Sequence, residues 1–322
     1  MTQSGSVPPM SHHQAPVPTA HRPIESSVRP RQDRQEEEEQ EPMSRQETAS
    51  GVRAGRAGVC PDTGLYLVPA RGEIGWRVGK EKYVRSSGIL SVRVNEHVGP
   101  LADDVPDERG RYDTLGRTVY FGKTAQASFA EVLQDIRRKR LAQEADASAA
   151  GYAFEEYVDT VNIQADENDV DRAWAISGKW QVDRCLHKVA MPSAGWWVRA
   201  DHHATINQVA TDLAAPLREM KVDLLTLGDL GGETRGVTTL IAEHIRNQNL
   251  FDGSRPLGIE FPSKTGYGTC WAWWDRRADD GLTPGTNDPK TLEDLNVNVS
   301  SFRKVAADWG LEILPGRPGG YD

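Results

Sequence analysis

A glutamate, Glu131, lies in a helical stretch next to small and uncharged residues. The segment 124–145 predicts a helix because its apolar residues recur on one face, at Ala125, Phe129, Val132, Leu133 and Ile136. The neighbours of Glu131 on the opposite side are Ala127, Ala130 and Gln134. A glutamate in such a place is most often simply solvated, but small neighbours indicate a face that lines a cleft. A carboxylate fixed in a cleft can stabilise a developing positive charge.

Two further polar side chains lie on or beside predicted strands. The stretch GIEFPSKTGYGTCWAWWD, residues 258–275, predicts a strand, a turn and a second strand, and Ser263 follows the first strand directly. Tyr120 lies on the strand 117–122 that leads into the helix, and it could reach the same space. No histidine is placed by the sequence as a base for Ser263, so this serine is not assigned as a nucleophile. Trp271 and Trp273 alternate onto one face, where core packing is expected.

Several other chemistries are not supported by the sequence motifs. The chain has no GxxxxGK[ST], GxGxxG, GxSxG, HExxH or CxxC motif. Cys60, Cys185 and Cys270 are far apart and odd in number, which favours neither a disulfide framework nor a metal cluster. The pair His202–His203 lacks a third ligand at metal spacing. No metal site is therefore predicted.

The remaining pattern mixes strands and helices without a strict alternation. Strands are predicted at 65–70, 72–79, 88–97, 117–122, 180–191, 195–201, 222–230 and across 258–275. Further helices are predicted at 205–220, where Pro216 should shorten or kink the helix, at 238–251, and at 300–314, where the helix runs into a short strand. The stretch 99–110 is rich in Pro, Asp and Gly and predicts a loop. This order favours an α+β fold over a doubly wound parallel sheet.

Composition limits the possible partners and locations. Residues 1–58 contain almost no large apolar side chains and include the run Glu36–Glu39, so they predict a disordered polar tail. A net charge of -9 over 322 residues argues against general affinity for nucleic acid. No apolar run approaches the roughly 20 residues that span a bilayer, and the first residues lack the pattern of a secretory signal. We therefore expect a cytoplasmic protein with no membrane contact.

The ordered set of polar residues resembles the signature of RES domains, named for an arginine, a glutamate and a serine. GWRVG supplies Arg77, RYD supplies Arg111, the strand RTVYFG supplies Tyr120, the helix supplies Glu131, and GIEFPS supplies Ser263. The resemblance covers roughly residues 65–280. It places a RES-like domain at 59–315, with a long central insert at about 140–235 and a short C-terminal tail at 316–322.

The resemblance implies an ADP-ribosyltransferase-like fold, with a mixed β-sheet core and surrounding helices, that acts on NAD as substrate without a true cofactor. Many members of the family are toxins that degrade NAD and are neutralised by a helix-turn-helix antitoxin. Glu131 would stabilise the cation left when nicotinamide departs, and Arg77 and Arg111 would hold the diphosphate. Tyr120 would contact the nicotinamide, and Ser263 a ribose or the nicotinamide amide. Arg77, Glu131 and Ser263 are thus the expected catalytic residues.

Three functions stay open at this point. The first is cleavage of the nicotinamide–ribose bond by hydrolysis or phosphorolysis, as the toxin of a toxin–antitoxin pair. The second is transfer of ADP-ribose to a protein, which would use the same residues. The third is a non-catalytic NAD-binding or regulatory module, suggested by the long insert and the acidic tail. Sequence alone does not separate these functions.

Overall fold

A computed structural model describes residue 52 and residues 55–81, 110–114, 117–168, 172, 174–232, 234–276 and 287–315. All of these residues belong to the unit Met43–Asp322. Most of the expected tail 1–58, the strand expected at 88–97 and the tail 316–322 lie outside the described residues. Within the expected tail, Val52 is buried and Gly58 opens the first strand.

Nine strands of the described chain form one mixed sheet in the order β1-β2-β7-β8-β9-β4-β3-β6-β10. They are β1 (Gly58–Val59), β2 (Tyr66–Pro69), β3 (Ile74–Lys80), β4 (Arg117–Gly122), β6 (Arg184–Ala190), β7 (Trp196–Arg199), β8 (Gly258–Pro262), β9 (Thr269–Asp275) and β10 (Lys290–Asn296). Neighbours are antiparallel except β7 and β8, which are parallel. A second, two-stranded sheet pairs β5 (Ala175–Ile176) with β11 (Glu312–Ile313).

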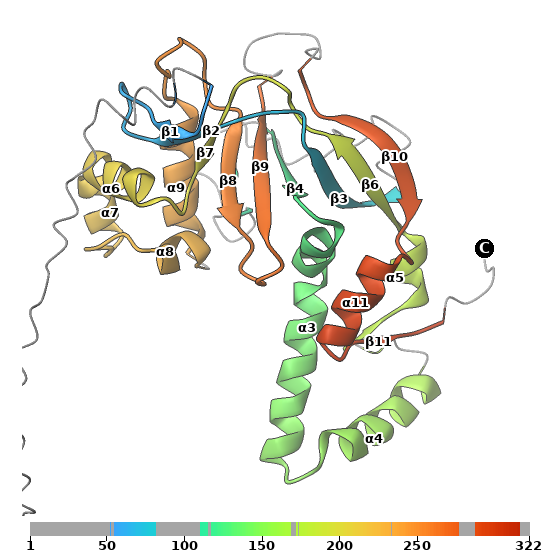
Figure 1. Cartoon of the computed structure of the whole chain (residues 1–322). Coiled ribbons are helices and arrows are strands. Elements are labelled where there is room, and N and C mark those ends of the chain that lie inside the picture. Colours follow the sequence, from blue (N-terminus) through green and yellow to red (C-terminus); the bar gives the residue numbers. More distant parts are fainter. Residues whose placement is uncertain are drawn as a thin grey trace, which may run out of the picture. The chain divides into compact units, whose positions relative to one another are not determined.

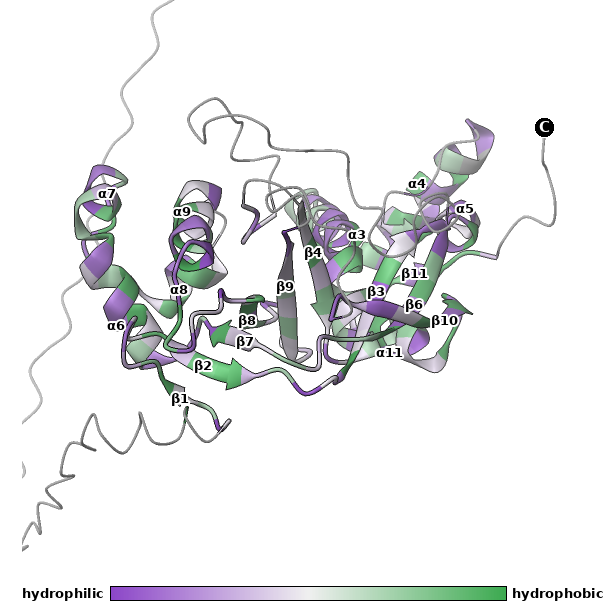
Figure 2. Ribbon diagram, turned by 90° about the horizontal axis from the view of Figure 1, so that it is seen from above, coloured by the Kyte–Doolittle hydropathy of each residue, from purple (hydrophilic) through white to green (hydrophobic). Residues whose placement is uncertain are grey.

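Helices gather in two groups along the large sheet (Figure 1; Figure 2). One group lies beside β1, β2, β7 and β8 and consists of α6 (His203–Asp212), α7 (Ala214–Glu219), α8 (Leu227–Gly231) and α9 (Arg235–Arg246). The other lies beside β3, β4 and β6 and consists of α3 (Ala125–Ala149), α5 (Gly178–Val182) and α11 (Ser300–Asp308), and α4 (Phe154–Glu167) packs on α3 away from the strands. A mixed sheet with helices in this arrangement is an α+β fold, as the sequence predicts.

The helix α3 forms where the sequence indicates. Thr124 caps it, because its side-chain oxygen accepts a hydrogen bond from the backbone N–H of Ala127 at 3.1 Å. Phe129 and Leu133 are fully buried in a cluster shared with α11, β3 and β6, while Val132 and Ile136 pack partly against the same cluster. Apolar periodicity therefore sets both the length of this helix and the side that it buries.

The alternation of β9 separates two hydrophobic clusters on the two faces of the sheet. Cys270, Ala272 and Trp274 belong to the cluster beneath α6, α7 and α9. Trp271 and Trp273 belong to the cluster on the other face and are almost fully buried. The prediction that these two tryptophans are core residues is confirmed.

Most element predictions are confirmed, and two are corrected. The strands at 65–70, 72–79, 117–122 and 195–201, the hairpin, and the helices at 238–251 and 300–314 are present with shifted ends. The strand predicted at 222–230 is wrong, because Thr226 and Asp229 form a capping box that starts α8. Residues 180–182 are helical rather than extended. The helix predicted at 205–220 divides at Leu213, three residues before Pro216, so the interruption predicted from this proline is confirmed.

The segment expected as a central insert contributes directly to the sheet. Strand β6 pairs with both β3 and β10, and β7 lies between β2 and β8. Residues 184–199 therefore supply two internal strands and are not a peripheral addition. None of the helices in the described ranges is both long and apolar enough to cross a bilayer.

Candidate functional site

The centre of the candidate site is a hydrogen bond between two residues that are 132 positions apart in the chain. The Ser263 hydroxyl donates to Oε1 of Glu131 at 2.6 Å. Ser263 follows β8 at the β8–β9 turn, and Glu131 lies in the second turn of α3, at the same end of the sheet (Figure 1). The structure thus brings together the glutamate and the serine that the sequence singles out.

The β8–β9 turn fixes the Ser263 hydroxyl. The backbone N–H of Ser263 donates to the carbonyl of Gly268 at 2.7 Å, which closes the turn. The backbone N–H of Thr265 donates to the Ser263 oxygen at 3.2 Å, and the Thr265 hydroxyl lies 2.5 Å from the same oxygen. With Thr265 donating and Glu131 accepting, the hydroxyl of Ser263 is saturated. This arrangement suits a residue that orients Glu131 better than it suits a nucleophile.

The second oxygen of Glu131 is also held. The Gln134 side-chain amide donates to Oε2 at 3.1 Å, one turn along the helix. Glu131 itself is half-buried, whereas Ala127 and Ala130 are fully buried in core clusters. The two alanines therefore pack in the core, and the prediction that they line a cleft is wrong. Glu131 is a fixed carboxylate with hydrogen-bond donors on both oxygens.

Arg111 lies on a turn that is held tightly in place. The side chain of Asp113 accepts a hydrogen bond from the backbone N–H of Gly110 at 2.7 Å and from the hydroxyl of Tyr120 at 2.7 Å. The backbone N–H of Tyr112 donates to the Tyr120 oxygen at 2.9 Å, and the indole N–H of Trp274 donates to the Tyr112 carbonyl at 3.2 Å. Strands β4 and β9 therefore position the turn that carries the arginine.

The guanidinium of Arg111 is buried without an opposite charge. Its side chain is only 7% exposed, and it lies 5.6 Å from the ring centre of Phe261 and 6.0 Å from that of Tyr112. Its Nε has no hydrogen-bond partner, and no ion pair joins Arg111 to a carboxylate within the described ranges. A buried charge in this condition is costly unless an anion accompanies it.

The thiol of Cys270 is influenced by the charges of both Glu131 and Arg111. The pKa of its thiol is raised to about 12, mainly by burial and also by the charge of Glu131, while the charge of Arg111 lowers it. Both charges thus act on the same thiol, which stays protonated at neutral pH. Cys270 is a buried core residue and is not a reactive nucleophile.

Tyr120 supports the site from below. Its hydroxyl binds Asp113 and the backbone of Tyr112, and its ring contacts Phe261 edge-on at 6.3 Å. Burial and the Asp113 charge raise the pKa of this hydroxyl well above its usual value. The hydroxyl therefore anchors the turn that carries Arg111.

Arg77 is placed differently from the other predicted residues. Its Nη1 donates to the backbone carbonyl of Tyr120 at 3.3 Å. Its neighbours Trp76 and Val78 pack against the cluster around α3, so the side chain of Arg77 leaves the opposite face of β3. Strands β3 and β4 share one paired position, Trp76 with Gly122. Arg77 thus forms a hydrogen bond with the backbone of β4, on the face of the sheet opposite to the cluster around α3.

Sequence reasoning missed four residues of this site: Thr265, Asp113, Cys270 and Phe261. Asp113 is part of the RYD stretch, but its bond to Tyr120 depends on how the turn folds over β4. Thr265 stands two residues after Ser263, a spacing at which side-chain hydroxyls commonly meet in turns. Cys270 and Phe261 alternate toward the helices from paired strands, and that face could be read from the hairpin pattern.

Comparison with known proteins adds no assignment. No model of a protein family, no curated protein and no solved structure matches this chain. A function for this protein can therefore be inferred only from its residues and their geometry.

Proposed function

We propose that this protein cleaves the nicotinamide–ribose bond of NAD, by hydrolysis or phosphorolysis, on a fold of the ADP-ribosyltransferase type. The observation that carries the proposal is the 2.6 Å hydrogen bond from Ser263 to Glu131. It joins two of the three residue types for which RES domains are named, from a helix and a hairpin far apart in the sequence. The buried Arg111, whose charge acts on the same Cys270 thiol as that of Glu131 and whose Nε has no hydrogen-bond partner, would supply a place for an anionic part of the substrate.

The proposed chemistry needs a fixed negative charge more than it needs an acid. Nicotinamide leaves NAD as a neutral molecule, so no proton has to be supplied to it. The ribose carbon then acquires the positive charge of an oxocarbenium-like transition state. The carboxylate of Glu131 would stabilise this charge, and the hydrogen bonds from Ser263 and Gln134 hold it in place beforehand.

Arg111 would bind the diphosphate of NAD. A guanidinium offers two parallel donors to phosphate oxygens, and its interaction is stronger where water is excluded. An incoming diphosphate would also remove the cost of leaving Arg111 buried without a counter-charge. Tyr120 and Arg77 would act through the positions of the Arg111 turn and of β4, rather than by touching the nicotinamide.

The direct test is release of free nicotinamide from NAD by the purified full chain, with water alone and with added phosphate. We expect release by the wild type and at most background release by Glu131→Ala. Asp135→Asn is the matched control, because Asp135 is an exposed carboxylate on the same helix with Arg138 as its partner. Absence of release by the wild type under both conditions would contradict the proposal.

The same proposal assigns the protein a cytoplasmic toxin role with a helix-turn-helix protein as antitoxin. Expression of the wild type should lower cellular NAD and slow growth, and Glu131→Ala should do neither. Incubating cell lysate with labelled NAD separates the remaining alternative: label on a protein would indicate ADP-ribose transfer, while free labelled products indicate cleavage. Harmless expression with unchanged NAD would instead favour a binding module.

A further inference from the structure

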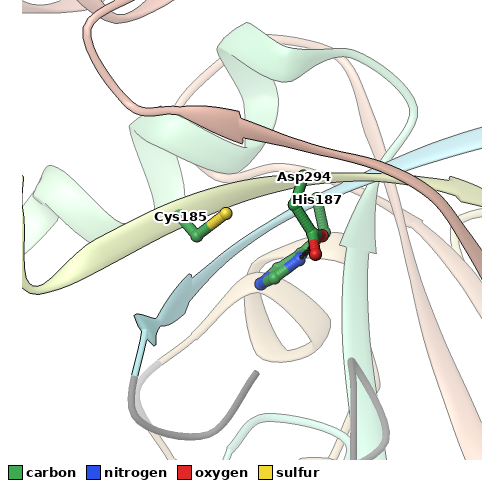
Figure 3. Close-up of side chains that lie close together, drawn as sticks. All are labelled: Cys185, His187 and Asp294. Carbon is green, nitrogen blue, oxygen red and sulfur yellow. Dashed lines mark hydrogen bonds and ion pairs between the residues drawn. The ribbon is translucent and has the colours of Figure 1, made fainter. Parts of the chain in front are cut away.

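Three potential metal ligands gather at the opposite end of the large sheet from β1. Cys185 and His187 lie two residues apart on β6, and Asp294 lies on β10 directly across from His187 in the strand register. Figure 3 shows the three side chains grouped between the two neighbouring strands. One ligand atom from each residue lies within 4.8 Å of the other two.

The three side chains share one face of the sheet. Leu186, between the two β6 residues, packs into the cluster around α3, so Cys185 and His187 leave the other face. Nδ1 of His187 lies 2.6 Å from Oδ1 of Asp294, and the His187 ring is only 2% exposed. Gly79 on β3 makes room for this ring, because a Cβ there would lie 3.0 Å from Nε2 of His187. The ring is therefore held in one orientation by both neighbouring strands.

The donor set identifies the class of ion. One thiolate, one imidazole and one carboxylate are the ligands of zinc, and calcium or magnesium would require mainly oxygen. In a tetrahedral zinc site the nitrogen and oxygen ligands stand about 3.3 Å apart. The present 2.6 Å between Nδ1 of His187 and Oδ1 of Asp294 is a hydrogen-bond distance. Zinc would replace the shared proton, and the distance between these two atoms would increase by about 0.7 Å.

The charge around Cys185 also favours a cation. The carboxylate of Asp294 lies beside this thiol, since the ligand atoms of the two residues are within 4.8 Å of each other. Its Sγ now donates to the backbone carbonyl of Leu295 at 3.3 Å. A zinc ion would reverse this situation by binding the thiolate and releasing the proton to solvent.

We propose that Cys185, His187 and Asp294 bind one zinc ion, with water in the fourth position, and that this ion fastens β10 to β6. The proposal is independent of the NAD-cleaving function, because the three residues lie on the face of the sheet opposite to the cluster that holds α3. Its role would be structural: β10 is exposed along almost its whole length and has few apolar contacts to hold it.

The first test measures zinc binding by the full chain after removal of metal with a chelator. We expect one zinc per chain, and at least tenfold weaker binding in Cys185→Ser and in Asp294→Asn. Asp294 is partly exposed, at 42% of its side chain, so this variant should fold. Cys60→Ser, a buried cysteine outside the cluster, and His244→Gln, from another His–Asp pair (with Asp212), are the matched controls and should bind as the wild type does.

Cobalt provides the second readout, because its spectrum reports the ligands. Co²⁺ bound by the wild type should give the visible bands of a tetrahedral site and a sulfur-to-cobalt charge-transfer band in the near ultraviolet. The latter should vanish in Cys185→Ser. Zinc should also raise the melting temperature of the wild type by roughly 5 °C and leave both cluster variants unchanged.

Several results would overturn the proposal. The wild type could bind no zinc, or the charge-transfer band could persist in Cys185→Ser. Equal zinc affinity in the wild type and both cluster variants would place the ion elsewhere, such as at His202 and His203, and would equally exclude this site.

Discussion

Two glutamates, Glu260 and Glu131, lie on opposite faces of the sheet at strands β8 and β9, and they differ in their hydrogen-bond and ion-pair partners. Glu260 lies within β8, is 3% exposed and receives the ammonium of Lys123 at 2.6 Å and the indole N–H of Trp271 at 3.2 Å. Glu131 meets the end of the same strand through Ser263, and its partners are a hydroxyl and an amide. No ion pair with Glu131 is found in the part of the chain that the structure describes.

The contrast extends to the positive charges. Lys123 is matched with Glu260, whereas the buried guanidinium of Arg111 has no carboxylate within salt-bridge distance among the described residues. A fold that needed only stability would pair such groups, because an unpaired buried charge is costly. On the face of α3 the charges of Glu131 and Arg111 have no such partner within the described ranges, and both act on the thiol of Cys270.

The largest expected effect is on activity and comes from neutralising the carboxylate of Glu131, which has no ion-pair partner among the described residues. Glu131→Gln keeps the shape of the side chain and the acceptor for Ser263, and the Gln134 amide can flip to accept a hydrogen bond from the new NH2 group, but the negative charge is removed. We expect the kcat for NAD cleavage to fall about 10³-fold, with a melting temperature within 2 °C of the wild type. Steady-state nicotinamide release and thermal unfolding measure the two quantities. A stable variant with full activity would make Glu131 equivalent to Glu260, a structural carboxylate.

Removing the guanidinium of Arg111 should weaken the binding of NAD without lowering the stability of the fold. Arg111→Met keeps the apolar contacts with Phe261 and Tyr112. We expect KM for NAD to rise about 100-fold, the loss of roughly 2–3 kcal/mol from charge-assisted hydrogen bonds. The free energy of unfolding should stay equal or rise by about 1 kcal/mol, since a lone buried charge is removed. Denaturant unfolding that shows a loss of several kcal/mol would assign Arg111 to the core instead.

Neutralising Glu260, the carboxylate paired with Lys123, should lower stability and leave activity unchanged. Glu260→Gln removes the partner of Lys123 and weakens the bond to Trp271. We expect the free energy of unfolding to fall by about 2 kcal/mol, because Lys123 is partly exposed and can regain water. The kcat of the folded enzyme should not change. Reduced kcat at unchanged stability would mean that the two faces of the sheet are not functionally separate.

The smallest expected effect is a pH dependence of stability that comes from the buried thiol of Cys270. The pKa of Cys270 is raised from 9.0 to about 12, so the unfolded chain loses this proton at a lower pH than the folded protein. Its contribution to stability is complete below about pH 9 and is lost as the pH rises toward 12. We expect the free energy of unfolding to fall by about 1 kcal/mol per pH unit between pH 9 and 10. Cys270→Ala should fall less steeply, and identical slopes would contradict the assignment.

The sequence predicts the secondary structure around the site well because local patterns determine it. The period of α3, its cap at Thr124 and the alternation of the β8–β9 hairpin are all local. The strand predicted at 222–230 fails for a local reason as well, since a capping box at Thr226 outweighs a short apolar run. The α+β class follows from these elements, but the order of the nine strands depends on long-range pairing that no local pattern specifies.

The candidate site is predicted in part. Glu131 and Ser263, both singled out from the sequence, form a direct hydrogen bond, and the charge of Arg111 acts on the same thiol as that of Glu131. Arg77 and Tyr120 act on the backbone and the Arg111 turn instead, because strand alternation and the fold of that turn direct their polar atoms there. The cluster of Cys185, His187 and Asp294 could not be predicted from cysteine spacing, since the register of β6 with β10 brings its third member across 107 residues.

The outermost strands have a consequence for how copies of this protein behave together. An exposed edge strand offers unpaired backbone groups to any other chain with extended structure. In the described part of the sheet, one edge is β1, which has two residues, and the other is β10, which carries Lys290, Glu293 and Asp294 and a break in register between Thr291 and Glu293. A short edge at one side and a bulged, charged edge at the other both resist strand addition. Concentrated solutions should therefore stay free of sheet-to-sheet aggregates for as long as β10 keeps its bulge.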